Sequence, residues 1–309
     1  MKSKIFLHFI SIFSILFSFA QSRDIDKTII VDGRERQYLV HLPPSFNSSN
    51  KLPIIFGLHG GGGTYKNTIR FYNLDNLADK NGFIIVYPNA ISKAWSMPGI
   101  TSRRKVLEEN VDDVKFISVL LDSLIANYKV DSNRVFCTGI SRGGMFSFYL
   151  AYKLSNRITA IAPVCGGISQ TISADYSFQH QTPALIINGT NDPLVRYNGG
   201  AGKFNKRNAD NEDADMLPTE DLVEKIVKLN NCKSKPVVSN IPDIDETDGC
   251  NAIDNIYSCN DVKVEFIKVV NGGHTWPGGS QYLPKFIIGK VCRDFSASEK
   301  IFDFFMRVK

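Results

Sequence analysis

The stretch Gly139-Ile140-Ser141-Arg142-Gly143 governs the interpretation of the whole sequence. Its glycines let the chain bend sharply around the serine, because they carry no side chain that could clash. Residues 135–137 before it favour a strand, and residues 145–150 after it can begin a helix. Such a strand–turn–helix bend exposes the serine hydroxyl at a helix N-terminus, where developing negative charge is stabilised. We therefore expect Ser141 to be a nucleophile.

Strand and helix patterns alternate along most of the chain. A hairpin is expected around Asp32-Gly33, with further strands at 52–58, 83–87, 134–138, 158–164, 184–188 and 262–270. Helices are expected at 110–128, 143–154, 219–229 and 296–307. This alternation predicts a mostly parallel sheet with helices on both faces and Ser141 after a central strand. No linker or change of composition divides residues 21–309, so we expect a single catalytic domain there.

The first twenty residues are typical of a secretory signal peptide. Lys2 and Lys4 precede an apolar run at 5–19, and Ser18-Phe19-Ala20 provides small residues for cleavage after Ala20. A membrane anchor is the alternative, but a spanning helix needs about 20 apolar residues. We expect a secreted protein, extracellular or periplasmic in a Gram-negative source, with no membrane association after cleavage.

Composition excludes several other classes of protein. The 309 residues are 43% hydrophobic and 22% charged, which is ordinary for a globular chain. The net charge is +5, but no Lys/Arg-rich run suggests a nucleic-acid partner. The acidic segments 208–215 and 243–249 lack the spacing of a calcium loop. We therefore expect no metal. Oligomeric state is left open.

A serine nucleophile needs a general base, and the sequence offers five histidines. His8 belongs to the expected signal peptide, whereas His41 and His180 lie in an early extended segment and a polar loop. His59 precedes a run of glycines and is expected to shape that loop. His274 follows the strand expected at 262–270, on a loop where a sheet places functional groups. We therefore expect His274 to be the base.

The base needs a carboxylate partner that fixes its tautomer. Asp192 follows the apolar strand expected at 184–188, although an aspartate before proline is also common in plain turns. The order Ser141, Asp192, His274 is that of α/β-hydrolases and differs from the orders in chymotrypsin and subtilisin. This order favours Asp192. Less favoured alternatives are Asp210, Asp213 and Asp215.

An oxyanion hole is expected from the glycines that follow the strand at 52–58. His59-Gly60-Gly61-Gly62-Gly63 has the sequence and position of an HGGG-type loop. The N–H groups of Gly61 and Arg142 are the expected donors. A phosphate cradle is the competing reading, but the segment lacks both a P-loop ending and the spacing of a dinucleotide fingerprint. We therefore expect no nucleotide and no other cofactor.

Six blocks together resemble one known group of enzymes. They are residues 58–62, 111–114, 139–145, 162–164, 188–192 and 273–279, of which His274-Thr275-Trp276-Pro277-Gly278-Gly279 is the most specific. They look like the secreted polyhydroxybutyrate depolymerase and feruloyl esterase group, which includes carbohydrate esterase family one. The resemblance extends from about Ile30 to the C-terminus. It implies an α/β-hydrolase fold, with Ser141, Asp192 and His274 as nucleophile, acid and base of a serine esterase.

The resemblance leaves the ester substrate open. It implies a small-molecule or polymer ester, such as a feruloyl or related polysaccharide ester or a hydroxybutyrate oligomer. Trp95 and Trp276 are candidates for stacking on a substrate ring, although core packing explains them equally well. A serine peptidase or acyltransferase could use the same three residues. A non-catalytic binding protein is a further alternative, which usually lacks one of them.

Six cysteines in an exported chain can form disulfides. Cys232 follows the helix expected at 219–229, and Cys259 precedes the strand expected at 262–270. This pair is the first choice, and it matches the pattern of the group that the sequence resembles. The remaining pairings stay open; Cys250 with Cys292 is a weaker pairing, and Cys137 and Cys165 fit buried free thiols equally well.

Overall fold

A computed structural model describes residues 23–47, 49–98, 100, 110–202, 215–259 and 263–308. The expected signal peptide lies outside these residues, as do the alternative acids Asp210 and Asp213. None of the helices within the described ranges combines the length and the apolar character that crossing a bilayer requires.

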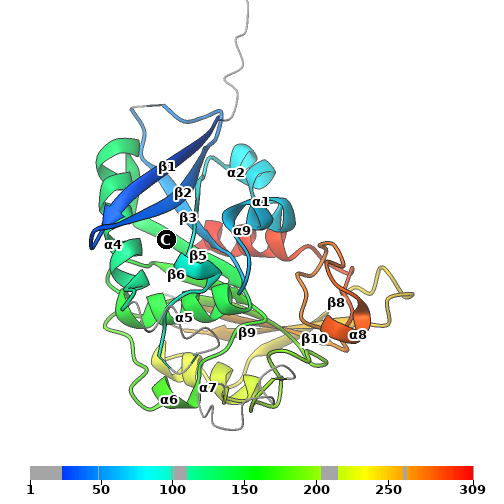
Figure 1. The fold of residues 1–309 in the computed structure, drawn as a ribbon. Helices are drawn as coiled ribbons and strands as arrows, with labels where there is room; N and C mark the ends of the chain where they lie inside the picture. Colours follow the sequence, from blue (N-terminus) through cyan, green and yellow to red (C-terminus); the bar gives the residue numbers. More distant parts are fainter. Residues whose placement is uncertain are drawn as a thin grey trace, which may run out of the picture.

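The strands of the described chain form one sheet of ten, shown in Figure 1. Its order is β1-β2-β4-β3-β5-β6-β7-β10-β9-β8. The central strands β4, β3, β5, β6, β7 and β10 are parallel, and β2 and β9 join them antiparallel at the two edges. The strands are β1 (Arg23–Val31), β2 (Arg34–Leu42), β3 (Leu52–Leu58), β4 (Ile84–Pro88), β5 (Val130–Ile140), β6 (Ala160–Val164), β7 (Ala184–Gly189), β8 (Val237–Ile241), β9 (Asn251–Ser258) and β10 (Lys263–Val270).

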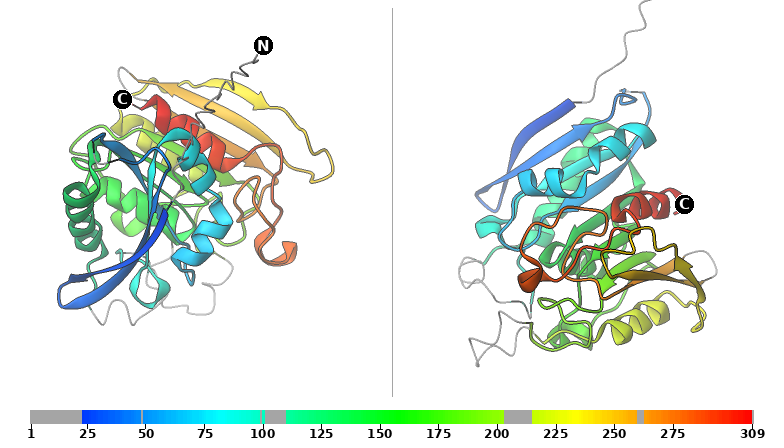
Figure 2. Two further views of the ribbon diagram at one scale, coloured as in Figure 1. Left: turned by 90° about the horizontal axis from the view of Figure 1, so that it is seen from above. Right: turned by 90° about the vertical axis from the view of Figure 1, so that its right-hand side faces the viewer.

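Helices cover both faces of this sheet. One face packs against α4, α5 and α7, and the other against α1, α2 and α9 (Figures 1 and 2). The helical segments are α1 (Tyr65–Tyr72), α2 (Asp75–Asn81), η1 (Ile91–Lys93), α4 (Asp113–Tyr128), α5 (Arg142–Lys153), α6 (Gln170–Ser173), α7 (Thr219–Leu229), α8 (Lys285–Ile288) and α9 (Ala297–Arg307). The parallel sheet with two covered faces confirms the sequence prediction.

Strand β3 is apolar throughout because successive side chains of a strand point to opposite faces of the sheet, and here both faces are covered. Ile54 and Phe56 enter the core on the α4 side, while Ile55 between them enters the core on the α9 side. All three are fully buried. Burying a side chain of this kind contributes about 1.5–3 kcal/mol, so a strand covered on both faces is held firmly in the centre of the sheet.

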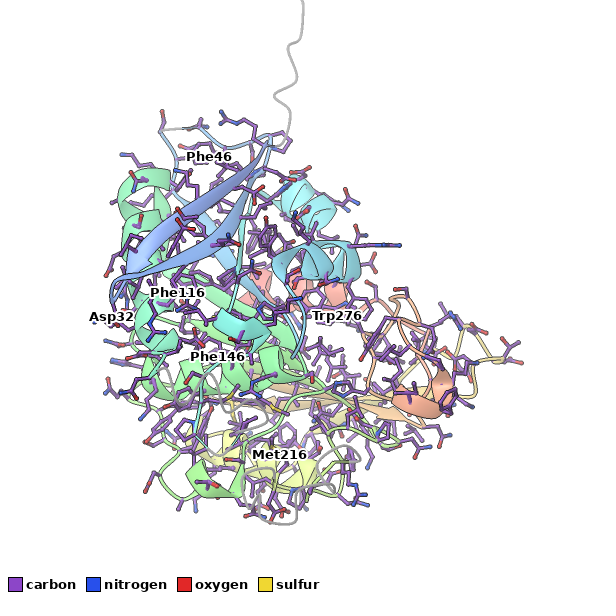
Figure 3. The ribbon with its side chains drawn as sticks, in the orientation of Figure 1. Asp32, Phe46, Phe116, Phe146, Met216 and Trp276 are labelled. Carbon is purple, nitrogen blue, oxygen red and sulfur yellow. A yellow bond between two sulfur atoms is a disulfide. The ribbon has the colours of Figure 1, made fainter. Side chains whose placement is uncertain are left out.

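The antiparallel edges differ in how well the sequence predicted them. The β1–β2 hairpin turns at Asp32-Gly33 as expected, and Asp32 marks its tip in Figure 3. The opposite edge, formed by β8 and β9, was missed (Figure 2). The residues of β8 are almost all exposed, so this strand has no apolar face that would show in the sequence pattern.

Candidate active site

The bend between β5 and α5 holds Ser141 in a strained conformation. Ser141 has φ 57° and ψ −124°, a region that L-residues rarely adopt. Its N–H donates to the carbonyl oxygen of Val164 at 2.9 Å. A Cβ on Gly139 or Gly143 would lie 2.5 or 2.2 Å from the carbonyl oxygen of Leu58. The sequence motif predicts the sharp bend, and the structure adds that the two glycines let it approach the end of β3 closely.

Asp192 and His274 meet beyond the ends of the parallel strands β7 and β10. The Nδ1 of His274 lies 2.6 Å from Oδ2 of Asp192, and each side chain is 2% exposed. The other carboxylate oxygen, Oδ1, accepts the N–H groups of Leu194 at 2.7 Å and Val195 at 2.8 Å. With Nδ1–H donated to the carboxylate, Nε2 of His274 carries the lone pair that can take a proton.

Ser141 belongs to the same edge of the sheet as this pair. Strands β5, β6, β7 and β10 are parallel neighbours, so their carboxyl ends share one edge. Cys165 follows β6, between the serine and the histidine, and its Sγ donates to the carbonyl oxygens of Gly273 and Thr275 at 3.7 and 3.3 Å. Burial, together with the nearby Asp192, raises the pKa of this thiol well above its usual value. Cys165 is therefore a neutral packing group beneath the histidine loop.

His59 holds the glycine loop in place, in the role that the sequence suggested. Its Nδ1 lies 2.8 Å from the carbonyl oxygen of Gly60, and its Nε2 accepts the N–H of Ala90 at 3.0 Å. The Trp95 indole N–H donates to the carbonyl oxygen of His59 at 2.9 Å. Burial lowers the pKa of His59 to about 4, so the ring is neutral near pH 7.

Gly61 and Arg142, the two residues expected to supply the oxyanion donors, lie close together. A Cβ on Gly61 would contact the Arg142 side chain at 3.7 Å. The N–H groups of Gly62 and Gly63 are taken by the carbonyl oxygens of Lys93 and Gly60, whereas that of Gly61 has no acceptor within the described ranges. Arg142 is the first residue of α5, where the helix dipole favours negative charge.

The guanidinium of Arg142 donates hydrogen bonds to the backbone of the segment that follows η1. Its Nε donates to the carbonyl oxygen of Trp95 at 2.9 Å, and an Nη donates to that of Ile100 at 2.7 Å. The sequence indicated a role for the backbone N–H of Arg142, because this residue follows Ser141. It gave no indication of a role for the side chain. Its side-chain role depends on contacts with residues more than 40 positions away.

Of the two roles that the sequence left open for Trp95 and Trp276, the structure shows core packing. Their exposed fractions are 0% and 1% (Trp276 is labelled in Figure 3). Trp95 stacks on Phe146 with ring centroids 4.7 Å apart, and Trp276 stacks on Tyr72 at 3.9 Å. Because each indole lies inside the protein against another ring, both act as core residues that support the active-site loops.

Tyr282 is a neighbour of the site that the sequence did not reveal. Its hydroxyl donates to the backbone carbonyl oxygen of His274 at 3.0 Å, and its ring meets Phe71 edge-on at 5.0 Å. The side chain is 42% exposed. Tyr282 therefore braces the histidine loop from the solvent side, a role that no local motif could indicate.

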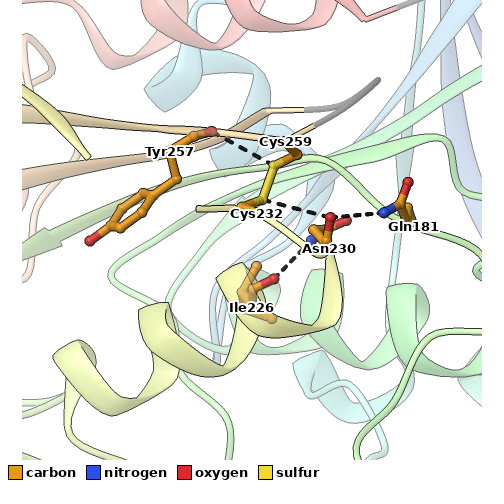
Figure 4. The surroundings of a disulfide bond; sticks show 6 residues. All are labelled: Gln181, Ile226, Asn230, Cys232, Tyr257 and Cys259. Carbon is orange, nitrogen blue, oxygen red and sulfur yellow. Dashed lines mark hydrogen bonds between the residues drawn. A yellow bond between two sulfur atoms is a disulfide. The ribbon is translucent and has the colours of Figure 1, made fainter. Parts of the chain in front are cut away.

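The cysteine pair named from the sequence forms a disulfide. Cys232 and Cys259 are bonded, which ties the end of α7 to the strand edge at β9 (Figure 4). The carbonyl oxygen of Asn230 beside the bridge accepts an N–H from Gln181 at 2.8 Å. The bridge therefore fastens the segment between β7 and β10, the two strands that precede Asp192 and His274. The other cysteines, Cys137, Cys165, Cys250 and Cys292, are free and buried.

Three groups of side chains bring atoms that can bind metals within 4.8 Å of one another in the described residues. In each group, carboxylate oxygens already accept hydrogen bonds from the protein, as Asp192 does from Leu194 and Val195. The groups are Cys165, Asp192 and His274; Asp24, His41 and Asp75; and Asp248, Cys292 and Asp294. Each group is therefore part of the protein's own hydrogen-bond network.

Comparison with known proteins identifies the family. Residues 30–209, more than half of the chain, match the family model described as "Putative esterase". The chain belongs to this esterase family. The esterase is 26% identical over 294 residues to "Putative esterase NocK" of Nocardia uniformis subsp. tsuyamanensis, covering 91% of this chain and 82% of that protein. It is 28% identical over 176 residues to "Probable feruloyl esterase C" of Aspergillus niger, covering 55% of this chain and 59% of that protein.

A solved structure supports the fold of the esterase. The acetyl xylan esterase from Aspergillus awamori has a TM-score of 0.59 at 14% identity, over 92% of this chain and 99% of that one. This likeness and the family match confirm the expected α/β-hydrolase fold. The esterase is accordingly a serine carboxylic-ester hydrolase, as the resemblance implied.

Proposed function

We propose that Ser141, Asp192 and His274 are the catalytic triad of this esterase. The observation that carries the proposal is the buried hydrogen bond between Asp192 and His274 at 2.6 Å, on the sheet edge where the strained Ser141 lies. A carboxylate that holds Nδ1–H directs the basic Nε2 toward the nucleophile and stabilises the imidazolium when it forms. The positive φ of Ser141 presents the hydroxyl above the sheet.

The chemistry proceeds through an acyl-enzyme. Ser141 Oγ attacks the ester carbonyl carbon as its proton moves to His274 Nε2, and the carbonyl oxygen becomes an oxyanion. The N–H groups of Gly61 and Arg142 stabilise this oxyanion, and losing one such donor costs about 3–4 kcal/mol. His274 then protonates the departing alcohol. Finally His274 takes a proton from water, the hydroxide attacks the acyl group, and the acid leaves as Ser141 regains its proton.

The proposed substrates are feruloyl or related polysaccharide esters, with hydroxybutyrate oligomers as the other polymer ester. The relative named as a feruloyl esterase supports the first class. The proposed location is outside the cytoplasm, after removal of residues 1–20. The Cys232–Cys259 disulfide supports that location, because such bonds persist in oxidising compartments.

The test compares Ser141→Ala with the wild-type enzyme on methyl ferulate and on hydroxybutyrate oligomers. We expect turnover of every ester to disappear while the circular dichroism spectrum is unchanged. Ser49→Ala, a replacement in an exposed loop, is the matched control and should keep full activity. Ester hydrolysis at the wild-type rate by Ser141→Ala would refute the assignment of the nucleophile.

A further inference from the structure

A cavity of about 590 Å³ lies outside the triad. It is built by the β1–β2 hairpin, the residue after β4 and the start of α1. None of the sequence motifs points to it. Apart from two lysines, its lining consists of Asp26, Thr28, Gln37, Thr64, Tyr65 and Asn89.

The cavity adjoins the oxyanion loop. Thr64 directly follows Gly63, and a Cβ on Gly60 would lie 3.7 Å from Cβ of Ser141. Four residues span at most about 14 Å, and the turn in which Gly63 N–H donates to the carbonyl oxygen of Gly60 shortens that path. A chain of two or three sugar rings could therefore reach from Ser141 into the cavity.

The wall of the cavity is held rigidly. The carboxamide oxygen of Asn89 accepts the backbone N–H of Tyr65 at 2.8 Å, and the Asn89 N–H donates to the carbonyl oxygen of Gln37 at 2.9 Å. The Tyr65 hydroxyl donates to Asp26 Oδ1 at 2.5 Å. This hydrogen bond raises the pKa of Tyr65 to about 12, so the phenol stays protonated. A preformed surface of this kind binds a ligand without a large ordering cost.

The chemistry of the lining suits a sugar. Hydroxyl, amide and carboxylate groups from Thr28, Thr64, Gln37 and Asp26 can exchange hydrogen bonds with ligand hydroxyls. The half-buried ring of Tyr65 offers an apolar face with a polar tip, which matches the mixed surface of a pyranose or furanose ring.

The charges in the cavity do not favour an anionic ligand. The Lys27 ammonium lies over the Tyr128 ring at 5.1 Å, and that of Lys66 lies 6.0 Å from the Tyr65 ring centroid. The side chain of Asp26 points to the opposite face of β1 from that of Lys27 and accepts the Tyr65 hydroxyl, so it adds a negative charge to the lining. Mixed charges dispersed in this way provide no convergent cluster for a phosphate or a polyanion. A neutral, hydroxyl-rich ligand fits better.

We propose that this cavity is a subsite for the neutral sugar units on the alcohol side of the scissile ester. The inference rests on the proposed function, because it assumes that the ester is carried by a saccharide. The cavity would give the enzyme its preference for polysaccharide esters over esters of simple alcohols, by binding the part of the substrate that does not react.

The test uses two esters with the same acyl group. Feruloylated arabinoxylan oligosaccharide carries the sugar chain, and methyl ferulate lacks it. We expect Tyr65→Ala and Gln37→Ala each to lower kcat/KM on the oligosaccharide ester about tenfold and to leave methyl ferulate within twofold. Arg70→Ala, an exposed replacement on α1 outside the cavity, is the control and should change neither. Equal losses on both esters, or no loss on either, would overturn the subsite.

A binding measurement separates failure of the subsite from failure of the proposed function. Unesterified arabinoxylan oligosaccharide is titrated calorimetrically into Ser141→Ala protein, with and without Gln37→Ala. Binding that Gln37→Ala weakens about tenfold supports the subsite, even if the wild-type enzyme hydrolyses no ferulate ester. Absence of binding overturns the subsite, even if both ferulate esters are hydrolysed. Gln37 is exposed, so its replacement should leave the fold intact.

Discussion

Replacing Gly143 with alanine tests how closely the bend at Ser141 must approach β3. The added Cβ would lie 2.2 Å from the carbonyl oxygen of Leu58 and 2.8 Å from that of His59. An ordinary carbon–oxygen contact is about 3.3 Å, so the two chain segments must separate by about 1 Å. Both obstructing atoms are backbone, so a side-chain rotation cannot relieve the clash.

The displacement moves the nucleophile relative to the oxyanion loop, since Leu58 leads directly into that loop. A misplacement of about 1 Å can cost about 10²-fold in rate. Overpacking of this kind also costs about 1–3 kcal/mol of stability, which lowers Tm by about 2–10 °C. We therefore expect kcat/KM on methyl ferulate to fall about 100-fold for Gly143→Ala, in a protein that is still folded.

The assay pairs steady-state kinetics with thermal unfolding. Gly167→Ala is the matched control, because a Cβ there meets only ordinary contacts, the nearest at 3.5 Å from Met216 Sδ. This control should keep kcat/KM within about twofold. If Gly143→Ala showed wild-type kcat/KM and wild-type Tm, the reasoning that links this close approach to catalysis would be refuted.

Three further predictions follow from single contacts. Asp192→Asn should lower kcat about 10⁴-fold without changing the circular dichroism spectrum, because an amide cannot fix the His274 tautomer; near-normal steady-state kinetics would contradict this. Replacing both Cys232 and Cys259 with serine should lower the free energy of unfolding by about 3.5 kcal/mol, because the bridge closes a loop of 27 residues and so restricts the unfolded chain. Urea titration measures this, and an unchanged urea midpoint would contradict it. His59 has a pKa of about 4 in the folded protein and an ordinary value of 6.5, so the unfolded chain binds more protons between these pH values. The free energy of unfolding should therefore fall by about 3 kcal/mol as pH drops from 6.5 toward 4, and His59→Gln should flatten the dependence; equal slopes for both proteins would argue against it.

Local sequence signals were sufficient for the centre of the fold. Strands β3, β4, β6 and β7 are buried on both faces, so each appears in the sequence as an apolar run, and residues 52–58 match β3 (Leu52–Leu58) at both ends. The Asp32-Gly33 turn likewise marks the β1–β2 hairpin, because glycine adopts the positive φ that such a turn needs. In contrast, β8 is exposed and, among the strands that the structure describes, pairs only with β9, so no pattern of buried positions marks it.

In the active site too, local sequence patterns indicated some residues and not others. Chain order and strand ends selected Ser141, Asp192 and His274, since parallel strands bring their carboxyl ends to one edge. The sequence could not decide whether Trp95 and Trp276 face substrate or core, because an aromatic residue suits both environments. The tertiary structure places both indoles in the core, where each stacks on another aromatic ring.

The sequence by itself determined the α/β architecture, the three candidate catalytic residues and the glycines of the oxyanion loop. Each depends on local backbone geometry or on the order of strands along the chain. The tertiary structure alone decided the burial of both tryptophans, the brace from Tyr282 and the cavity beside Tyr65. These features arise where segments distant in sequence meet, as Tyr65 meets Asp26 across 39 positions. Such contacts depend on how the elements pack, and a local pattern of residues does not encode them.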